Sequence, residues 1–390
     1  MSHHRAIAAV FVAHGAVAGS LSTRIPWIQE HLHLTPGTLG LALLCPSIGA
    51  FVGMPMAGRL AYRFGNRAAT RVLLALWCAG LALPALSPSP VWLFGAFLLF
   101  GAAAGMCDVA MNAHAVLLER QLGRSIMSGL HGMWSVGSLA AGGLGALAAH
   151  TGLDARIHLG AMSLALLGLG AVAGRGLLPD SGMTGGSVRD APPPRRFALP
   201  TRGVLAIGLV GFCATFAEGA SSNWSAVYLT AVADAGPGLA AAGYTVFMLC
   251  MASARLLGDH VIRRLGPAAT VRAGGAVAAV GGALVVAART PALGIAGFAL
   301  VGLGIAVIVP LVIAAAGNAG TTPGEGVAGV ATITYLSGLI APAVTGWVAG
   351  ALSYPAAFAL ITCVVVLLTV LAPVVRPSHL SPEGAVRVDA

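Results

Sequence analysis

Twelve apolar stretches, each long enough to form a membrane-spanning helix, fill this chain of 390 residues. A helix needs about 20 mostly apolar residues to cross a bilayer core of roughly 30 Å. Charged residues make up only 8% of the composition and the mean hydropathy is +0.89, whereas about a quarter of an average soluble domain is charged. No soluble fold would bury that much apolar surface. The chain is therefore predicted to be an integral membrane protein.

Charges, prolines and glycine-rich breaks separate the twelve stretches. Only helices and closed barrels satisfy their backbone hydrogen bonds in lipid. A barrel would show alternating hydrophobicity over segments of about ten residues, whereas these runs are continuous, so we predict an all-α bundle of twelve transmembrane helices. The predicted spans are residues 6–28, 37–57, 70–88, 91–116, 129–150, 157–178, 203–231, 239–257, 270–288, 292–316, 327–351 and 355–375.

All 21 basic residues are arginine, and their positions predict the orientation of the bundle. Cytoplasmic loops carry an excess of basic residues. Seventeen arginines fall on one predicted side, which is expected to be cytoplasmic and to hold both termini. They are Arg5, Arg59, Arg63, Arg67, Arg71, Arg120, Arg124, Arg175, Arg189, Arg195, Arg196, Arg202, Arg263, Arg264, Arg272, Arg376 and Arg387. This topology explains the net charge of +9, with attraction to anionic lipid as a second effect, and nothing indicates nucleic-acid binding.

Composition and motifs also limit the chemistry of the chain. The six cysteines fall in predicted spans without the spacing of a disulfide framework or a zinc site. The sequence shows no nucleotide-binding or catalytic motif, so we expect no cofactor, no metal and no enzymatic activity. Arginine without lysine, in an alanine-rich chain, is typical of a GC-rich bacterial genome. We expect a monomeric, multi-pass protein of the bacterial inner membrane.

An internal repeat divides the chain into two halves of six spans. The turn after the second span, residues 65–71, reads Gly-Asn-Arg-Ala-Ala-Thr-Arg, and residues 266–272 read Gly-Pro-Ala-Ala-Thr-Val-Arg. Chance similarity between alanine-rich helices is the alternative, but it would not place a basic turn after the second span of both halves. The predicted organisation is an N-terminal half at 1–178, a cytoplasmic linker at 179–202, a C-terminal half at 203–376 and a cytoplasmic tail at 377–390.

Parallel halves around a midplane site are typical of secondary transporters, and the whole chain resembles the major facilitator superfamily. The best-known mark of that family is the loop at residues 58–67, where an acid of the family pattern is replaced by Tyr62. In the family this acid helps to latch the halves in the outward-facing state. The resemblance implies gating roles for Arg59 and Arg63 and for the acid Asp259, which lies near the corresponding loop of the second half. The arginines of both loops are also explained by the excess of basic residues that marks cytoplasmic loops. Arg255, one turn before Asp259, predicts a salt bridge with it, either at the gate or as a static helix-end pair.

Four segments narrow the resemblance to the YbjJ-like transporters, which are related to the fucose permease group. The segments are residues 24–26, 108–112, 128–135 and 218–229. The fucose permease group cotransports a sugar with a proton and has an acid and an asparagine four residues apart in the fourth span, a pair that Asp108 and Asn112 match. The YbjJ-like pattern often has an acid before the seventh-span tryptophan, where this chain has Asn223.

Two carboxylates inside predicted spans, Asp108 and Glu218, are the candidate proton-coupling residues. A charge at bilayer depth costs a few kcal/mol and usually faces the bundle interior. Asn112 is one helical turn from Asp108, and the following span brings His131 to a similar depth. The alternative for Asp108 is a purely structural cluster with these two residues. The alternative for Glu218 is a neutral, hydrogen-bonded side chain or a fixed ion pair with Arg24 or Arg255.

Aromatic and polar residues complete a candidate substrate site. Aromatic faces stack on sugar rings, asparagine both donates and accepts hydrogen bonds, and arginine holds an anion with two bonds. Trp27 and Tyr228 are equally explained as interfacial anchors, and His14 as a packing residue or a proton relay. The substrate-binding candidates are Arg24, Trp27, Asn112, His131, Trp134, Asn223, Trp224 and Tyr228.

These observations predict proton-coupled symport of a small polar, sugar-like solute by alternating access. The expected partners are that solute, protons and the lipid bilayer. One alternative is a proton-driven efflux antiporter for an amphipathic metabolite or drug, since the same fold serves both directions. Another is a membrane sensor that retains the fold without moving a solute.

Overall fold

The computed structural model describes residues 2–34, 36–180, 202–235, 237–319 and 323–376, and these residues contain helices and no strand. The helices of the first half are α1 (His3–Ser22), α2 (Ile25–His31), α3 (Pro36–Phe64), α4 (Asn66–Gly80), α5 (Pro90–Leu122), α6 (Met127–His150) and α7 (Ala155–Arg175). Those of the second half are α8 (Arg202–Ala233), α9 (Pro237–Leu265), α10 (Pro267–Ala287), α11 (Pro291–Ile305), α12 (Ile308–Ala319), α13 (Pro323–Ala351) and α14 (Tyr354–Leu371), followed by the 3-10 helix η2 (Ala372–Val375). Most of the proposed linker and all of the proposed tail lie outside the described residues.

The predicted all-α fold of twelve spans in two six-helix halves is confirmed. Within the described residues, eleven segments are long and apolar enough to cross a membrane. The remaining span, the third along the chain, is α4, whose 15 residues are followed by turns that extend to Leu86. Its helix ends early because Pro84 has no N–H to donate to the carbonyl of Gly80.

The same turns join corresponding helices in the two halves. Gly65, between α3 and α4, has a φ of 87°, and Gly266, between α9 and α10, has a φ of 78°. Glycine adopts this backbone region without steric cost. α5 and α11 also begin alike, with Ser89 and Thr290 at their N-caps and a proline directly after each. The sequence repeat is therefore a repeat of structure, with an offset of 201 residues at these turns.

Two predicted spans are divided in the structure. The first span breaks after α1, and the short helix α2 starts at Ile25 with a proline in its first turn. The tenth span breaks between α11 and α12, at Ala306 and Val307. The second break has a chemical cause, because residue 310 is a proline and cannot donate the helical hydrogen bond to the carbonyl of Ala306.

Each half has its own apolar core, built from helices that approach closely. In the first half, α1 packs against α6 and α3 against α5. Gly101 of α5 lies directly against the backbone of Pro46 in α3, which leaves no room for a side chain there. The second core includes Tyr228, Phe298 and Phe358, whose rings meet edge to face.

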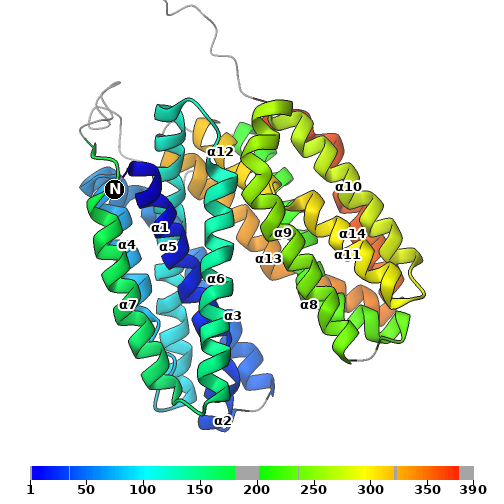
Figure 1. The fold of residues 1–390 in the computed structure, drawn as a ribbon, viewed down its shortest axis with the longest axis horizontal. Coiled ribbons are helices and arrows are strands. Elements are labelled where there is room, and N and C mark those ends of the chain that lie inside the picture. Colours follow the sequence, from blue (N-terminus) through cyan, green and yellow to red (C-terminus); the bar gives the residue numbers. More distant parts are fainter. Residues whose placement is uncertain (1, 35, 181–201, 236, 320–322, 377–390) are drawn as a thin grey trace, which may run out of the picture.

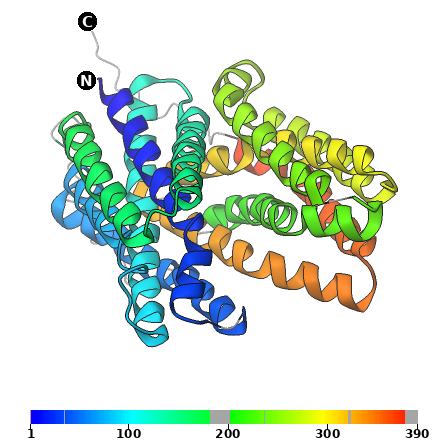
Figure 2. The same ribbon diagram turned by 60° about the horizontal axis from the view of Figure 1, so that its bottom comes forward.

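The two halves lie side by side and do not meet equally along their length. Figure 1 shows that α6 and α9 approach one another near the end of the bundle where α1 begins, here called the terminal end, and diverge toward the end that carries α2. α3 of the first half also packs against α13 of the second. The view of Figure 2, turned toward the α2 end, shows the same two groups of helices. The structure is thus closed by contacts between the halves at its terminal end.

Candidate functional site

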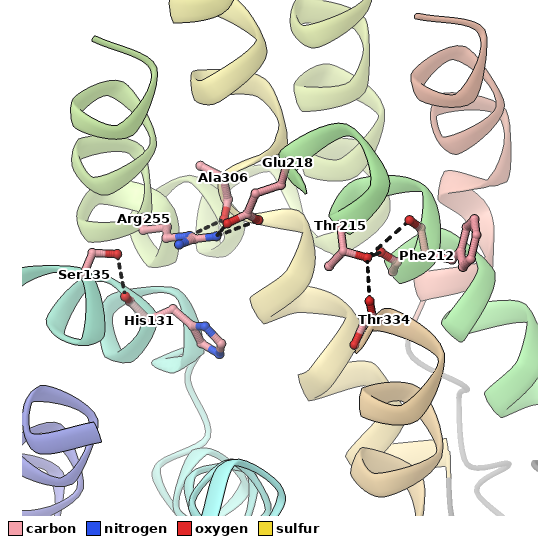
Figure 3. A network of polar contacts seen from close by, with 9 residues as sticks. His131, Ser135, Phe212, Thr215, Glu218, Arg255, Ala306 and Thr334 are labelled. Atoms are coloured by element: carbon pink, nitrogen blue, oxygen red, sulfur yellow. Dashed lines mark hydrogen bonds and ion pairs between the residues drawn. The ribbon is translucent and has the colours of Figure 1, made fainter. Parts of the chain in front are cut away.

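Glu218 and Arg255 form an ion pair between α8 and α9 in the second half (Figure 3). Nη2 of Arg255 lies 3.1 Å from each carboxylate oxygen of Glu218. The arginine side chain is 7% exposed and the glutamate side chain 28% exposed. A guanidinium does not lose its proton in proteins, so a buried arginine needs a counter-charge. Of the two partners predicted for Glu218, the structure selects Arg255 rather than Arg24.

The helix break in the tenth span holds the other side of Arg255. Its Nε donates to the carbonyl oxygen of Ala306 at 3.1 Å. This carbonyl is free because Pro310 supplies no N–H to it. Arg255 is therefore fixed by the charge of Glu218 and by the backbone between α11 and α12, and these contacts join three helices of the second half.

Asp108, Asn112 and His131 form a second polar cluster, in the first half. The amide nitrogen Nδ2 of Asn112 donates to Oδ1 of Asp108 at 3.0 Å and to the Asp108 carbonyl at 2.9 Å. Oδ1 of Asn112 lies 3.2 Å from Nε2 of His131. Because an amide oxygen only accepts, Nε2 carries the hydrogen in this arrangement. The predicted proximity of the three residues is confirmed, whereas their role in proton coupling stays a prediction.

Residues from the second half lie near this cluster. Tyr335 of α13 packs against the core of the first half and is within electrostatic range of Asp108. His131 is within electrostatic range of Arg255, and Figure 3 shows the two side chains on facing helices. The Asp108 cluster and the Glu218 pair thus lie on opposite sides of one interface between the halves. Tyr335 was not predicted as a site residue, because no charged residue stands beside it in the apolar span at 327–351.

The buried His14 and the half-buried Trp134 form a hydrogen-bonded pair near the Asp108 cluster. The indole N–H of Trp134 donates to Nδ1 of His14 at 2.9 Å, and Nε2 of His14 lies 3.5 Å from the Ala104 carbonyl oxygen. His14 also stacks on Trp77, with ring centroids 5.2 Å apart. An indole only donates, so Nδ1 of His14 accepts and the ring is neutral. These contacts support the packing interpretation of His14 and hold Trp134 against α1.

Arg24 and Trp27 lie at the α2 end and are not brought to the central clusters. Arg24 is 2% exposed and donates to Nδ1 of His158 and to the carbonyl of Leu153. Trp27 stacks on His31, and the guanidinium of Arg156 lies 5.5 Å from its ring centroid. Arg24 therefore ties the break after α1 to the start of α7. The substrate-binding role of both residues stays a prediction.

Asp154, at the N-cap of α7, pairs with Arg156 at 2.9 Å on the exposed surface of the α2 end. The hydrogen bonds from the side chain and backbone of Arg156 lower the pKa of Asp154 to about 2.

The three candidates on α8 have different surroundings. Asn223 is exposed and donates to the Gly219 carbonyl. The indole N–H of Trp224 donates at 3.2 Å to the carbonyl of Pro342 in α13. Tyr228 is fully buried, and its hydroxyl donates at 2.6 Å to the Val285 carbonyl. The interfacial-anchor interpretation of Tyr228 is wrong, because the ring lies inside the second core.

Asp259 closes the terminal end by binding the first turn of α6 from the other half. Its carboxylate accepts hydrogen bonds from the backbone N–H groups of Ser128 and Gly129 at 3.0 and 2.7 Å, and from the Ser125 hydroxyl at 3.0 Å. The free N–H groups at the start of a helix attract negative charge. The predicted salt bridge between Arg255 and Asp259 is therefore wrong: each residue has a different and better partner.

Further contacts reinforce this closure. Glu119 of α5 accepts from the backbone N–H groups of Ile126 and Met127 at 2.8 and 3.1 Å, so carboxylates from both halves cap α6. Arg120 donates to Oδ1 of Asn318 at 2.6 Å and also to the carbonyl of Gly317. Glu119 and Arg120 were not predicted as site residues, because they lie beyond the fourth apolar stretch.

The predicted gating arginines of the first half do not take part in these contacts. Arg63 lies over the ring of its neighbour Phe64, 5.3 Å from the centroid. Within the described residues, neither Arg59 nor Arg63 forms an ion pair or a hydrogen bond. The terminal end is closed instead by Asp259 of α9, which binds the start of α6, and by Arg120 of α5, which binds α12.

The fold and the interface define a class of protein, a helical membrane protein built from two six-helix halves. A family model described as the Major Facilitator Superfamily matches residues 7–322. The chain belongs to this superfamily, as the sequence resemblance predicted.

Among proteins of known sequence, an uncharacterised MFS-type transporter of Yersinia pestis is 36% identical over 370 residues, which cover 94% of this chain and 93% of that protein. The membrane protein MosC of Rhizobium meliloti is 30% identical, with 93% and 87% covered.

Solved structures share the fold at low identity. FucP in its outward conformation superposes with a TM-score of 0.76 at 15% identity, covering 95% of this chain and 98% of that one. The proton:xylose symporter XylE gives a TM-score of 0.68 at 13% identity, covering 94% of each chain.

Proposed function

We propose that this protein is a proton-coupled symporter that imports a small polar, sugar-like solute by alternating access. The observation that carries the proposal is the position of Asp108 and Glu218, one carboxylate in each half, on two sides of the interface between the halves. Both side chains are partly exposed rather than sealed in a core. Such intramembrane carboxylates mark proton and substrate pathways.

The two acids differ in their partners, which suggests different roles. Glu218 has the fixed cation Arg255, whereas Asp108 is bound by the neutral amide of Asn112. Within the described residues, no arginine forms an ion pair with Asp108. Binding a proton is then the way in which the Asp108 carboxylate becomes neutral, so we assign the coupling proton to this residue. A proton that reached Glu218 would release Arg255 to bind the solute.

The arginine distribution supports a cytoplasmic location of the terminal end. With that assignment, the contacts of Asp259 and Arg120 close the cytoplasmic end, and the structure corresponds to an outward-facing state. Solute and proton would enter from the α2 end. Breaking the contacts of Asp259 with α6 would then be required for release to the cytoplasm.

A sugar-like solute is supported by the side chains near the interface and by the structural neighbours. Asn112, His131 and Arg255 supply hydrogen-bond donors, and Glu218 supplies acceptors, a mixture that suits hydroxyl groups. Among the neighbours, FucP is a fucose:proton symporter and XylE a proton:xylose symporter.

The test is proton flux in liposomes that contain the purified protein and an internal pH dye. A panel of sugars and other polar metabolites is added to wild type, Asp108→Asn and Glu218→Gln, with Asp154→Asn as a control for loss of an exposed acid. We expect solute-dependent acidification in wild type and the control, and its loss in Asp108→Asn. Proton movement opposite to the solute would instead establish an efflux antiporter, and no flux of any solute would favour a sensor.

A further inference from the structure

A groove between α4 and α7 lies on the outer side of the first half, remote from the central clusters. It has a volume of about 510 Å³, and its walls are apolar except for Arg71. The walls include Leu74 and Ala75 of α4 and Leu167 and Ala171 of α7. Figure 1 shows these two helices at the edge of the first half that lies farthest from the second half. The groove therefore opens toward lipid rather than toward the path proposed for the solute.

The repeat shows why the two helices stand apart here. The residue equivalent to Leu74 in the second half is Gly275, at an offset of 201 residues. Gly275 lies directly against Thr369 of α14, so α10 and α14 pack closely at this level. In the first half, the Leu74 side chain occupies the corresponding space, and a Cβ at Gly170 of α7 would lie 3.1 Å from it. Leucine in place of glycine separates α4 from α7.

Arg71 is held at the mouth of the groove with its charge unpaired. The stem of its side chain lies over Gly174, where a Cβ would be 2.8 Å from Cγ of Arg71. The residue is exposed, and within the described residues no hydrogen bond or ion pair engages its guanidinium. A larger residue than glycine at position 174 would displace this side chain. The packing therefore positions a free cation at one end of an apolar groove.

The surroundings of Arg71 are basic. Arg67 donates to the carbonyls of Gly174 and Arg175 at the end of α7, and Arg175 itself is exposed. The acid nearby is Asp180, whose carboxylate accepts from the Arg67 backbone N–H at the start of α4. Three arginines and one carboxylate give this end of the groove a net positive charge, which favours an anionic group.

We infer that this groove is a binding site for an anionic phospholipid, with the phosphate on Arg71 and an acyl chain between α4 and α7. The ligand must combine a negative head group with a long apolar chain, since the site combines a free guanidinium with a lipid-facing apolar groove. Basic pockets between transmembrane helices bind anionic head groups in this way. Free phosphate would use only the charge and would leave the groove empty. The inference does not rest on the proposed transport function.

The test is native mass spectrometry of the full chain in detergent, titrated with phosphatidylglycerol or phosphatidylcholine. The repeat supplies a matched control, because Arg272 is the equivalent of Arg71 and is also exposed. Arg71→Gln removes one arginine near the head group and is expected to lower the affinity for the first phosphatidylglycerol molecule about fivefold. Arg272→Gln is expected to leave that affinity unchanged. Ala171→Trp, which fills the groove, should weaken it too, whereas Ala165→Trp outside the groove should not.

Three results would overturn the inference. An equal loss of phosphatidylglycerol affinity in Arg71→Gln and Arg272→Gln would show only a general attraction of the lipid to a basic surface. Unchanged binding in Ala171→Trp would show that the groove holds no chain. Equal binding of the two lipids by wild type would show that the head-group charge is not recognised. If Arg71→Gln does not fold, Arg71→Lys retains the charge, and the two tryptophan variants still test the groove.

Discussion

Glu218→Gln should destabilise the protein through the arginine that it leaves behind. The substitution keeps the shape of the side chain and one acceptor oxygen but removes the counter-charge of Arg255, which stays 7% exposed. Removing one partner of a buried ion pair costs about 3–5 kcal/mol, and for this partly exposed pair we expect a smaller cost of about 2 kcal/mol. The reduction follows from the 28% exposure of Glu218 and from the hydrogen bond that Ala306 still accepts.

The measurement is a double-mutant cycle for the free energy of unfolding in mixed micelles, using Glu218→Gln, Arg255→Met and the double variant. Removing both charges leaves no unpaired cation, so we expect a coupling free energy of about 2 kcal/mol between the two sites. The exposed pair of Asp154 and Arg156, with Asp154→Asn, Arg156→Met and the double variant, is the control and should show weaker coupling. A coupling for Glu218 and Arg255 that is near zero, or no larger than that of the exposed pair, would refute the reasoning.

Three further outcomes are expected. Asp259→Asn removes one acceptor of the helix N–H groups and the charge, which should weaken closure of the terminal end by about 1 kcal/mol; spin-label distances across that end should then show more open molecules, and an unchanged distribution would argue against the latch. Tyr228→Phe removes one of the two hydrogen bonds that the Val285 carbonyl accepts, while the bond from the Ala288 N–H stays; it should lower the free energy of unfolding by about 1 kcal/mol without changing solute affinity, so a large change in affinity would count against its structural role. The pKa of Asp154 is lowered to about 2 from its ordinary value of 3.8, so its stabilisation is present above pH 4 and is lost as the pH falls through about 2; the stability difference between wild type and Asp154→Asn should shrink over that range, and a difference independent of pH would contradict this.

Most of the fold was predictable because the bilayer constrains it strongly. Continuous apolar runs permit only helices, and the glycine-containing turns at Gly65 and Gly266 revealed the repeat. The proximity of Asp108, Asn112 and His131 followed from one helical turn and one antiparallel hairpin. Short-range spacing was sufficient for these features because the residues concerned lie on one helix or on consecutive spans.

Contacts between distant helices were harder to predict. Arg255 and Asp259 are one turn apart, but spacing only makes them neighbours and does not make them partners. Asp259 instead binds the free N–H groups of α6, and Arg255 binds Glu218. A signal for the second partner of Arg255 did exist, since Pro310 leaves the Ala306 carbonyl without a helical donor. No local pattern indicated that Trp134 would bind His14, because that contact depends on how α1 packs against α6.

The most direct test of the central claim compares two kinds of transport by Asp108→Asn in liposomes. Accumulation of the solute against its gradient requires coupling to a proton gradient, whereas exchange of solute at equal concentrations on both sides requires only alternating access. The account predicts that Asp108→Asn loses gradient-driven accumulation and retains exchange. Gradient-driven accumulation at the wild-type level in Asp108→Asn would contradict the assignment of the coupling proton to Asp108.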